Sequence, residues 1–388
     1  MSTVARPGPP PTRPARVRRL RRAAVAVLVV VLLLLVAVAG IGWYFSGIAV
    51  ALGSHDFRPD ATVRSVDVAT IRLSSTDSTR EPGDAALEWA GGYGRLGAVL
   101  ATGPDDVTRA FTPVTGRPAP GTSVQVDIFE PRSDPRTALG LAFTDVGLPG
   151  ELGALPTWYV PATSSQGTWA VFAHGHDSSR QESLRYLALL HERGLPVLVP
   201  SYRNDVGAPA SPDGQQHLGD TEWRDLEPAV RFALDHGARD VVLLGWSMGG
   251  ALALQFVDRS PLRGRVRGLV LDSPVVDWGD VLQHQARMRH LPDAVTWVAQ
   301  RFVGERLGID LGRLDWAARA RELHTPVLLV HSDADDFVPD GPSKALARAR
   351  PELVTYVDIP GAGHTRGWNV DPKRYRAALL DWFGREGV

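Results

Sequence analysis

The sequence predicts an α/β fold built around a mostly parallel, doubly wound sheet. From about residue 168 onward, short apolar runs alternate with segments of helical periodicity, and this alternation is typical of parallel sheets covered by helices. In residues 241–250, an apolar run passes through a serine flanked by glycines into good helix formers. Ser, Asp and His residues follow three different predicted strands, and the carboxyl ends of parallel strands meet at one edge of the sheet.

The apolar pattern assigns the elements of this sheet. Strands are expected at residues 169–173, 196–201, 241–244, 266–271, 326–330 and 353–359. Helices are expected at residues 182–193, 221–236, 250–259 and 372–383. Residues 141–146 and 152–160 should form an antiparallel hairpin that leads into the sheet, because the Gly- and Pro-containing residues 147–150 favour a turn.

The N-terminus carries a basic segment followed by a long apolar one. Residues 1–22 contain seven arginines, five prolines and no acidic residue, so this tail is expected to be disordered. Residues 23–45 are uncharged and end with an aromatic cluster that includes Trp43 and Tyr44, and they are long enough to cross a bilayer as a helix. Because the arginines precede the apolar segment, the positive-inside tendency predicts a single-pass membrane protein with a cytoplasmic N-terminus and an extracytoplasmic body.

A cleavable signal peptide is the alternative interpretation of the apolar segment. Residues 37–39 read Ala-Val-Ala, which is similar to a cleavage site with small residues. The apolar run continues beyond that point through Ile41 and Phe45, which favours an uncleaved anchor. Both interpretations place the body of the protein outside the cytoplasm.

Composition excludes several kinds of site. The chain of 388 residues has no cysteine, so disulfides, thiolate metal sites and cysteine nucleophiles are excluded. The net charge of −1 becomes about −8 without the seven tail arginines, so the body is not expected to bind nucleic acid. No feature of the sequence specifies an oligomeric state.

A candidate nucleophile, Ser247, lies in residues 245–249, which read Gly-Trp-Ser-Met-Gly between a predicted strand and a predicted helix. In that context Gly-x-Ser-x-Gly is typical of a sharp turn that exposes a reactive serine. A serine hydroxyl needs an adjacent base and a third group that orients the base. Downstream, one strand is followed by Asp335 and the last strand by His364, and the chain order Ser, Asp, His is the one expected in this kind of sheet.

These segments together resemble the α/β-hydrolase superfamily, and within it the lipase/esterase and prolyl-oligopeptidase-like serine hydrolases. The resemblance rests on the segments 245–250, Asp-Asp-Phe-Val-Pro at 335–339, Gly-Ala-Gly-His at 361–364, Phe-Ala-His-Gly-His at 172–176 and Ser-Tyr-Arg at 201–203. It covers roughly residues 141–388 and implies a hydrolase that forms an acyl-enzyme and requires no cofactor.

The resemblance also implies which acid acts. The acid of this family often lies in Gly-x-x-Asp-x-x-Val-Pro, and residues 332–339 match this pattern with Ser in place of Gly, which selects Asp335. Asp333 and Asp336 are the neighbouring alternatives. Asp272, which follows another strand, is a further candidate, although a carboxylate in a strand-end turn explains it more simply.

Two backbone N–H groups are expected to bind the oxyanion. One belongs to Met248, directly after the nucleophile, and the resemblance implies that the other belongs to His176. His174 and His176 could alternatively be metal ligands, but no acid–histidine cluster accompanies them, and no metal is expected. Arg203 could bind an anionic substrate group, or it could form an ion pair with Asp225 or Glu222.

Four parts of the chain are therefore expected: a basic cytoplasmic tail at 1–22, a transmembrane helix at 23–45, a β-rich region at 46–120 and a catalytic domain at 121–388. Short strands are expected at 69–74 and 96–101 in the β-rich region, and at 124–129 in the catalytic domain. Residues 275–320 interrupt the strand–helix alternation and are rich in Trp and Val. They are expected to form a small helical cap over the active site, or helices that pack on the sheet.

Three functions remain open at this point. The first is a membrane-anchored hydrolase of carboxylic esters, with a small-molecule or lipid acyl substrate or an acyl group of the cell envelope. The second is a peptidase or amidase, because the same three residues cleave amides. The third is a catalytically inactive fold used for binding.

Overall fold

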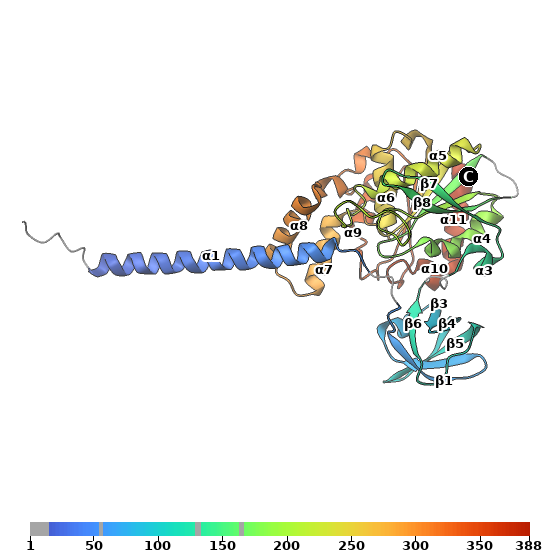
Figure 1. Ribbon diagram of the computed structural model, residues 1–388, viewed down its shortest axis with the longest axis horizontal. Coiled ribbons are helices and arrows are strands. Elements are labelled where there is room, and N and C mark those ends of the chain that lie inside the picture. The colour runs from blue at the N-terminus through green and yellow to red at the C-terminus, as the bar shows by residue number, and fades with distance from the viewer. Residues whose placement is uncertain (1–14, 54–56, 129–132, 163–166) are drawn as a thin grey trace, which may run out of the picture.

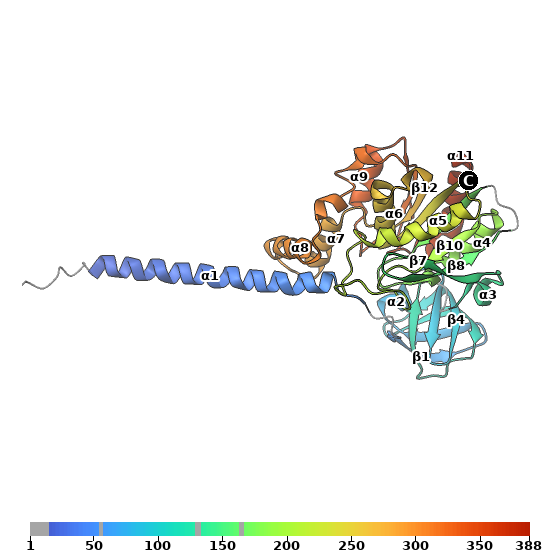
Figure 2. The same ribbon diagram turned by 45° about the horizontal axis from the view of Figure 1, so that its top comes forward.

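The protein is described by a computed structural model, which covers residues 15–53, 57–128, 133–162 and 167–388. It consists of a long N-terminal helix, a small β-barrel and a larger α/β unit (Figure 1). Helix α1 projects away from the body, and the barrel lies against one side of the α/β unit (Figures 1 and 2).

Helix α1 spans Ala15–Ala49 and contains the whole predicted apolar segment. Within it, an 18-residue window reaches a mean hydropathy of 3.3 and none of that window is buried, so its length and composition suit a membrane crossing. Residues 15–22 were expected to be disordered, but they are helical, because the Ala, Arg and Leu there favour a helix that has already been nucleated downstream. The rest of the predicted tail, residues 1–14, lies outside the described residues.

The β-rich region is a closed barrel rather than a pair of short strands. Its strands are β1 (Ala61–Val66), β2 (Thr70–Ser74), β3 (Ala85–Trp89), β4 (Gly92–Thr102), β5 (Asp106–Thr115) and β6 (Ser123–Asp127). They close in the order β1-β2-β5-β4-β3-β6, and the short helix α2 (Asp77–Arg80) lies between β2 and β3. Closure pairs both edges of the sheet, and apolar side chains such as Ile71, Leu87 and Phe111 fill the interior.

Strand β6 corrects the predicted domain boundary. Its residues were expected to begin the catalytic domain, but β6 pairs with both β1 and β3 and closes the barrel. Val124 is fully buried inside the barrel core, so the strand gains more from the barrel than from any sheet edge. The boundary lies after Asp127 rather than at residue 120.

The α/β unit contains an eight-stranded sheet in the order β14-β13-β12-β11-β9-β10-β8-β7. The strands are β7 (Thr144–Pro149), β8 (Ala154–Val160), β9 (Thr168–Ala173), β10 (Val197–Pro200), β11 (Asp240–Trp246), β12 (Val266–Asp272), β13 (Val327–His331) and β14 (Val354–Asp358). Strands β9 to β14 pair in parallel, and β8 is antiparallel to both β7 and β10. The predicted mostly parallel sheet with an antiparallel N-terminal hairpin is confirmed.

The turn of that hairpin lies later than predicted. Strand β7 continues through residues 147–149, and the turn is closed by a hydrogen bond from the Gly150 N–H to the Gly153 carbonyl. Leu148 is buried and pairs with Leu155. The burial of this leucine therefore outweighs the turn preference of the Gly-Leu-Pro-Gly sequence.

Helices cover both faces of the sheet. On one face lie α5 (Glu227–Asp235), α6 (Met248–Arg259) and α9 (Gly341–Ala349), and on the other lie α4 (Leu184–Glu192) and α11 (Pro372–Glu386). Successive residues of β11 alternate between the two cores, with Leu243 on the α6 side and Leu244 on the α4 side. The remaining short helices are α3 (Pro135–Leu139) and α10 (Gly367–Val370).

Residues 275–320 form the helices α7 (Trp278–Met288) and α8 (Asp293–Leu307), followed by short 3-10 turns. One side of this pair is part of the core, since Val281, Val303 and Leu307 belong to the same apolar cluster as α6. The expectation that these helices pack on the sheet therefore accounts for the residues that face the core. The outward side bears the exposed Met288 and Trp297. Packing on the sheet does not account for these two residues.

The barrel is attached to the α/β unit at α10. The side-chain amide of Asn369 donates to the carbonyls of Asp84 (2.6 Å) and Ile128 (2.7 Å), and the Asp84 N–H donates to the Asn369 carbonyl (3.2 Å). Gly83 has φ +89°, and a Cβ there would overlap the Asn369 carbonyl. The barrel is thus held on the segment that directly follows His364.

Candidate active site

Ser247 lies on the sharp turn between strand β11 and helix α6. Its backbone has φ 51° and ψ −118°, a conformation that costs energy for a residue with a side chain. The turn is stabilised by hydrogen bonds from the Ser247 N–H to the Asp272 carbonyl (3.0 Å) and from the Val275 N–H to the Ser247 carbonyl (3.1 Å). The side chain is thereby held above the carboxyl end of the sheet.

The backbone around Ser247 leaves no room for a side chain at the two neighbouring glycines. A Cβ at Gly245 would overlap the backbone of Gly249, and a Cβ at Gly249 would overlap the carbonyl oxygen of Ala173. Neither neighbour is a flexible side chain, so the backbone itself would have to move. The sharp turn that the Gly-x-Ser-x-Gly motif predicts therefore needs glycine at both positions.

Gly249→Ala is expected to destabilise the fold by about 1–3 kcal/mol through overpacking, and to lower the yield of protein that reacts with a fluorophosphonate. Thermal unfolding and labelling check this expectation. Gly264→Ala serves as the control, because a Cβ at that exposed position meets nothing. Equal melting temperatures for the two variants would contradict the overlap.

Three of the predicted site residues lie in one hydrogen-bonded chain. The Nε2 atom of His364 is 2.9 Å from Ser247 Oγ, and its Nδ1 atom is 2.8 Å from Asp335 Oδ2. Each residue comes from the end of a different parallel strand: β11, β13 and β14. The arrangement suits proton transfer from the serine hydroxyl to the imidazole, with the carboxylate orienting the ring.

Among the predicted acids, the structure brings Asp335 to the histidine. Asp333 and Asp336 are exposed, and Asp333 instead accepts a hydrogen bond from the Gly361 N–H (3.2 Å). Asp272 is buried, but its carboxylate is bonded to the hydroxyls of Tyr186 (3.2 Å) and Tyr375 (3.0 Å). Burial raises the pKa of Asp272, and its contacts with the two tyrosine hydroxyls give it a structural role.

The carboxylate of Asp335 is strongly stabilised in its charged form. Its Oδ1 accepts hydrogen bonds from the backbone N–H groups of Phe337 (3.0 Å) and Val338 (2.8 Å). Burial by itself would raise the pKa of Asp335, but hydrogen bonds and charge from His331 and His364 outweigh it and hold the pKa well below its usual range. Asp335 is therefore ionised at neutral pH.

His331 is a supporting residue that the sequence analysis did not identify. It is buried, its Nε2 lies 3.2 Å from Asp335 Oδ2, and its Nδ1 lies 2.8 Å from Ser343 Oγ on α9. His331 thus contacts the same carboxylate oxygen of Asp335 that His364 contacts, and it helps to position the acid. A histidine at the end of a predicted strand, four residues before the acid, was the available signal.

The two predicted oxyanion residues flank Ser247. Met248 is the first residue of helix α6, and the first-turn N–H groups of a helix have no partner within it. On the other side, the backbone of Gly175 approaches Ser247 so closely that a Cβ would lie 3.3 Å from the serine Cβ, and His176 is the next residue. The Gly175 N–H donates to the buried Glu182 (2.7 Å), which holds this loop in place.

His174 and His176 have different surroundings. His174 is fully buried, stacks on Tyr202 and contacts Asp205 Oδ2 through Nε2 at 2.8 Å. Burial lowers the pKa of His174, but the Asp205 carboxylate outweighs that effect and raises it overall. His176 is partly exposed and lies 3.1 Å from Asp177. Within the part of the chain that the structure describes, no group of three or more potential ligands gathers as a metal site.

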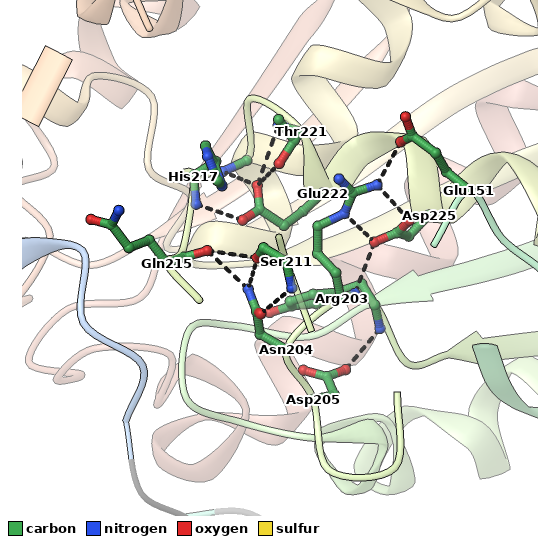
Figure 3. A network of polar contacts seen from close by, with 12 residues as sticks. Glu151, Arg203, Asn204, Asp205, Ser211, Gln215, His217, Thr221, Glu222 and Asp225 are labelled. Carbon is green, nitrogen blue, oxygen red and sulfur yellow. Dashed lines mark hydrogen bonds and ion pairs between the residues drawn. The ribbon is translucent and has the colours of Figure 1, made fainter. Parts of the chain in front are cut away.

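Arg203 lies in the loop that follows β10, is itself buried, and belongs to a network of polar contacts (Figure 3). Its Nε and Nη2 donate to the two oxygens of Asp225, both at 2.8 Å, and Nη2 also donates to Glu151 (3.0 Å). Of the two predicted partners, Asp225 is the one that pairs. Glu222 instead accepts hydrogen bonds from backbone N–H groups of residues 217 and 219.

Arg203→Ala is expected to lower the free energy of unfolding by about 3–5 kcal/mol, because it leaves the Asp225 carboxylate buried without its partner. Denaturant unfolding measures this loss, and the KM of the folded protein should stay within about twofold. The exposed Arg321→Ala is the control. A raised KM with unchanged stability would instead indicate that Arg203 binds a substrate anion.

Comparisons with known proteins agree with the fold. Residues 170–378, more than half of the chain, match the family described as "Alpha/beta hydrolase family". The chain therefore belongs to the α/β hydrolase family. Residues 62–127, which form nearly the whole barrel, match a family described as a domain of unknown function (DUF8805).

The chain is also similar to curated proteins and to solved structures. The chain is 30% identical over 217 residues to the uncharacterized protein Rv2307c of Mycobacterium tuberculosis, and the match spans 53% of this chain and 66% of the relative, just under two thirds. It is 23% identical to YfhR of Escherichia coli K12 over 54% of this chain and 69% of that protein. The esterase Pf2001 of Pyrococcus furiosus has a TM-score of 0.53 at 19% identity, and covers 66% of this chain and 95% of its own. At that identity the likeness concerns the fold.

Proposed function

We propose that the protein is a membrane-anchored serine hydrolase that cleaves carboxylic esters, with its catalytic part outside the cytoplasm. The single observation that supports this function most is the chain Ser247–His364–Asp335, with distances of 2.9 Å and 2.8 Å between neighbouring side chains. The esterase fold of the solved relative is consistent with it.

In the acylation step, Ser247 Oγ attacks the ester carbonyl carbon while its proton passes to His364 Nε2. The negative charge that develops on the carbonyl oxygen is bound by the backbone N–H groups of Met248 and His176. The carbon–oxygen bond of the ester then breaks, and the alcohol leaves with the proton from His364. Asp335 holds the imidazole in the required tautomer and stabilises its protonated form.

In the deacylation step, water replaces the alcohol. His364 takes a proton from the water, the resulting oxygen nucleophile attacks the acyl-enzyme, and Ser247 recovers its proton as the carboxylic acid is released. Atoms balance as ester plus water giving acid plus alcohol. These steps use only side chains and backbone groups of this chain.

The ester assignment is tested with the purified full-length protein on p-nitrophenyl esters of increasing chain length and on the matching p-nitroanilides. We expect hydrolysis of the esters and labelling by a fluorophosphonate, both of which disappear in Ser247→Ala. Ser65→Ala, in barrel strand β1, is the control. Faster cleavage of the anilides would favour an amidase, and failure to label would indicate an inactive binding protein.

Topology is tested with single cysteines, because the chain contains none. Val68→Cys is at a position that is 89% exposed in the barrel, whereas Ser2→Cys lies before the apolar segment. A membrane-impermeant maleimide is expected to label Val68→Cys in intact cells and Ser2→Cys only after lysis. The reverse pattern would contradict the orientation, and an intact mass below 41.9 kDa for the untagged wild-type protein would indicate cleavage.

A further inference from the structure

Helix α1 has an exposed part and a packed part. Residues 17–37 are exposed along their whole length, whereas Gly42 and Ser46 are buried against the body, as is Val50 directly after the helix. A bilayer of about 30 Å is crossed by about 20 helical residues. Counted from Arg22, the last arginine of the tail, the crossing ends near Gly42. The packed part of α1 therefore begins where the helix leaves the hydrocarbon.

The packed part of α1 is fixed to helix α8. A Cβ at Gly42 would lie 2.7 Å from Val298, so the two helices are in close contact there. The Trp43 and Phe302 rings meet edge to face at 5.5 Å. The guanidinium of Arg306 lies 3.6 Å from the centre of the Trp43 ring and donates to Ser46 Oγ (3.1 Å). In both views α8 lies alongside the end of α1 (Figures 1 and 2).

The outward surface of α7 and α8 has the composition of an interfacial segment. This surface, called the cap face below, is defined by the exposed residues Arg287, Met288, Arg289, His290 and Trp297. Trp297 is 68% exposed and Met288 is 53% exposed. Trp297 is adjacent in sequence to Val298, which contacts α1, so it lies at the depth of Gly42. Tryptophan beside basic residues is typical of a surface at lipid headgroups. Both acids of α8 are paired with arginines, Asp293 with Arg287 at 3.6 Å and Glu305 with Arg301 at 2.6 Å.

The pair of helices that carries the cap face, α7 and α8, also contacts the candidate active site. The ring of His284 on α7 is hydrogen-bonded to the Asp336 carbonyl (2.8 Å), and the Gln285 side chain donates to the Phe337 carbonyl (3.0 Å). Phe337 is 45% exposed, and its ring centre lies 5.2 Å from that of His364. Helix α7 thus connects the cap face to the turn that holds Asp335.

A second connection runs through the chain that follows α1. The Gly53 N–H donates to Asp177 Oδ1 (2.7 Å), and Asp177 directly follows His176. Helix α1 ends at Ala49, and four extended residues span at most about 14 Å. The rim of the site at Asp177 therefore lies close to the end of the bilayer-crossing helix.

From this continuity we infer that the cap face rests on the outer leaflet of the membrane that α1 crosses, and that the substrate is the ester of a lipid in that leaflet. The anchor, the cap and the rim of the site form one connected unit. Helix α7 links the cap face to the turn that places Phe337 beside His364, and we expect a lipid ester at the cap face to reach the site along this link. The exposed apolar residues of the cap are explained as membrane contacts.

The contact of the cap face with the membrane is tested by fluorescence. Trp297→Cys and Val68→Cys, each in the full-length protein, are labelled with the fluorophore NBD. Both are reconstituted into phosphatidylcholine–phosphatidylglycerol vesicles that contain nitroxide-labelled lipid. We expect quenching at position 297 to be at least about threefold stronger than at position 68, because only the former enters the headgroup region. Equal quenching at the two positions would overturn the seating.

The substrate class is tested with a double variant of the cap face, Trp297→Ser with Met288→Ser. Its control is Val68→Ser with Leu100→Ser, which removes exposed apolar residues from the barrel. The cap variant is expected to hydrolyse long-chain phosphatidylglycerol in vesicles about 10-fold more slowly and water-soluble p-nitrophenyl butyrate within about twofold of wild type. The control should match wild type on both. Unchanged lipid hydrolysis by the cap variant would overturn the role of the cap face in presenting the lipid.

This inference rests on the proposed esterase function, and the two fail in different ways. A protein that hydrolyses neither ester, with the label at position 297 still quenched, contradicts the esterase function and supports the seating. A protein that hydrolyses the butyrate ester but no vesicle lipid supports the esterase function and overturns the lipid substrate.

Discussion

Ser247→Ala is expected to lower kcat for ester hydrolysis by about 10⁴- to 10⁶-fold. The substitution removes the oxygen that forms the acyl-enzyme, and neither His364 nor Asp335 can replace it. The backbone turn persists, because its hydrogen bonds to Asp272 and Val275 use main-chain atoms. Steady-state kinetics on p-nitrophenyl butyrate measures the loss, and a melting curve verifies that the variant is folded.

Any activity that remains in Ser247→Ala would indicate that another residue can act as the nucleophile. Ser273 is also buried near the site, but its hydroxyl accepts a hydrogen bond from the Thr365 N–H (3.1 Å) and contacts Asp272 (3.2 Å). A Ser247→Ala protein that is folded and still labelled by a fluorophosphonate would contradict the assignment of Ser247.

Asp335→Asn is expected to lower kcat by about 10⁴-fold. An amide can turn its NH₂ toward His364 Nδ1, which stabilises the tautomer that cannot accept the serine proton. The matched controls Asp333→Asn and Asp336→Asn alter exposed carboxylates that do not contact His364, so their rates should stay within a few-fold of wild type. A large loss in Asp336→Asn with an active Asp335→Asn would show that the wrong acid had been chosen.

The lowered pKa of Asp335 predicts that the stability of the fold depends on pH. The pKa of Asp335 is held below its ordinary value of 3.8, so the ionised carboxylate stabilises the folded state wherever the unfolded group is also ionised. That contribution is fully present above about pH 4 to 5 and is lost as the pH falls through the lowered folded pKa. The difference in melting temperature between wild type and Asp335→Asn should therefore shrink below about pH 4. A difference that grows in acid would contradict the lowered pKa.

Short segments of the sequence were sufficient to predict the centre of the candidate site. The glycines around Ser247 impose the turn, and Asp335 and His364 each follow a strongly apolar strand. Parallel strands bring their carboxyl ends to one edge whatever the length of chain between them. Because both the motifs and the strands are local, these three residues could be predicted to meet before any coordinates were considered.

The role of supporting residues depended on long-range packing. Of the three neighbouring aspartates, Asp335 is the one that is buried and that contacts His364, which comes from the end of another strand. His331 supports the acid only because α9 brings Ser343 to its other nitrogen. Side-chain burial and pairing of this kind arise from segments that are distant along the chain.

The sequence alone determined the α/β sheet, the apolar N-terminal helix and the serine, histidine and acid, since each is encoded by a continuous pattern of neighbouring residues. The tertiary structure alone decided that β6 closes the barrel, and that α8 packs on α1 through Gly42 and Arg306. Strand pairing and helix docking depend on the complementarity of two surfaces that are far apart in sequence. A pattern within either segment does not specify the partner of that segment.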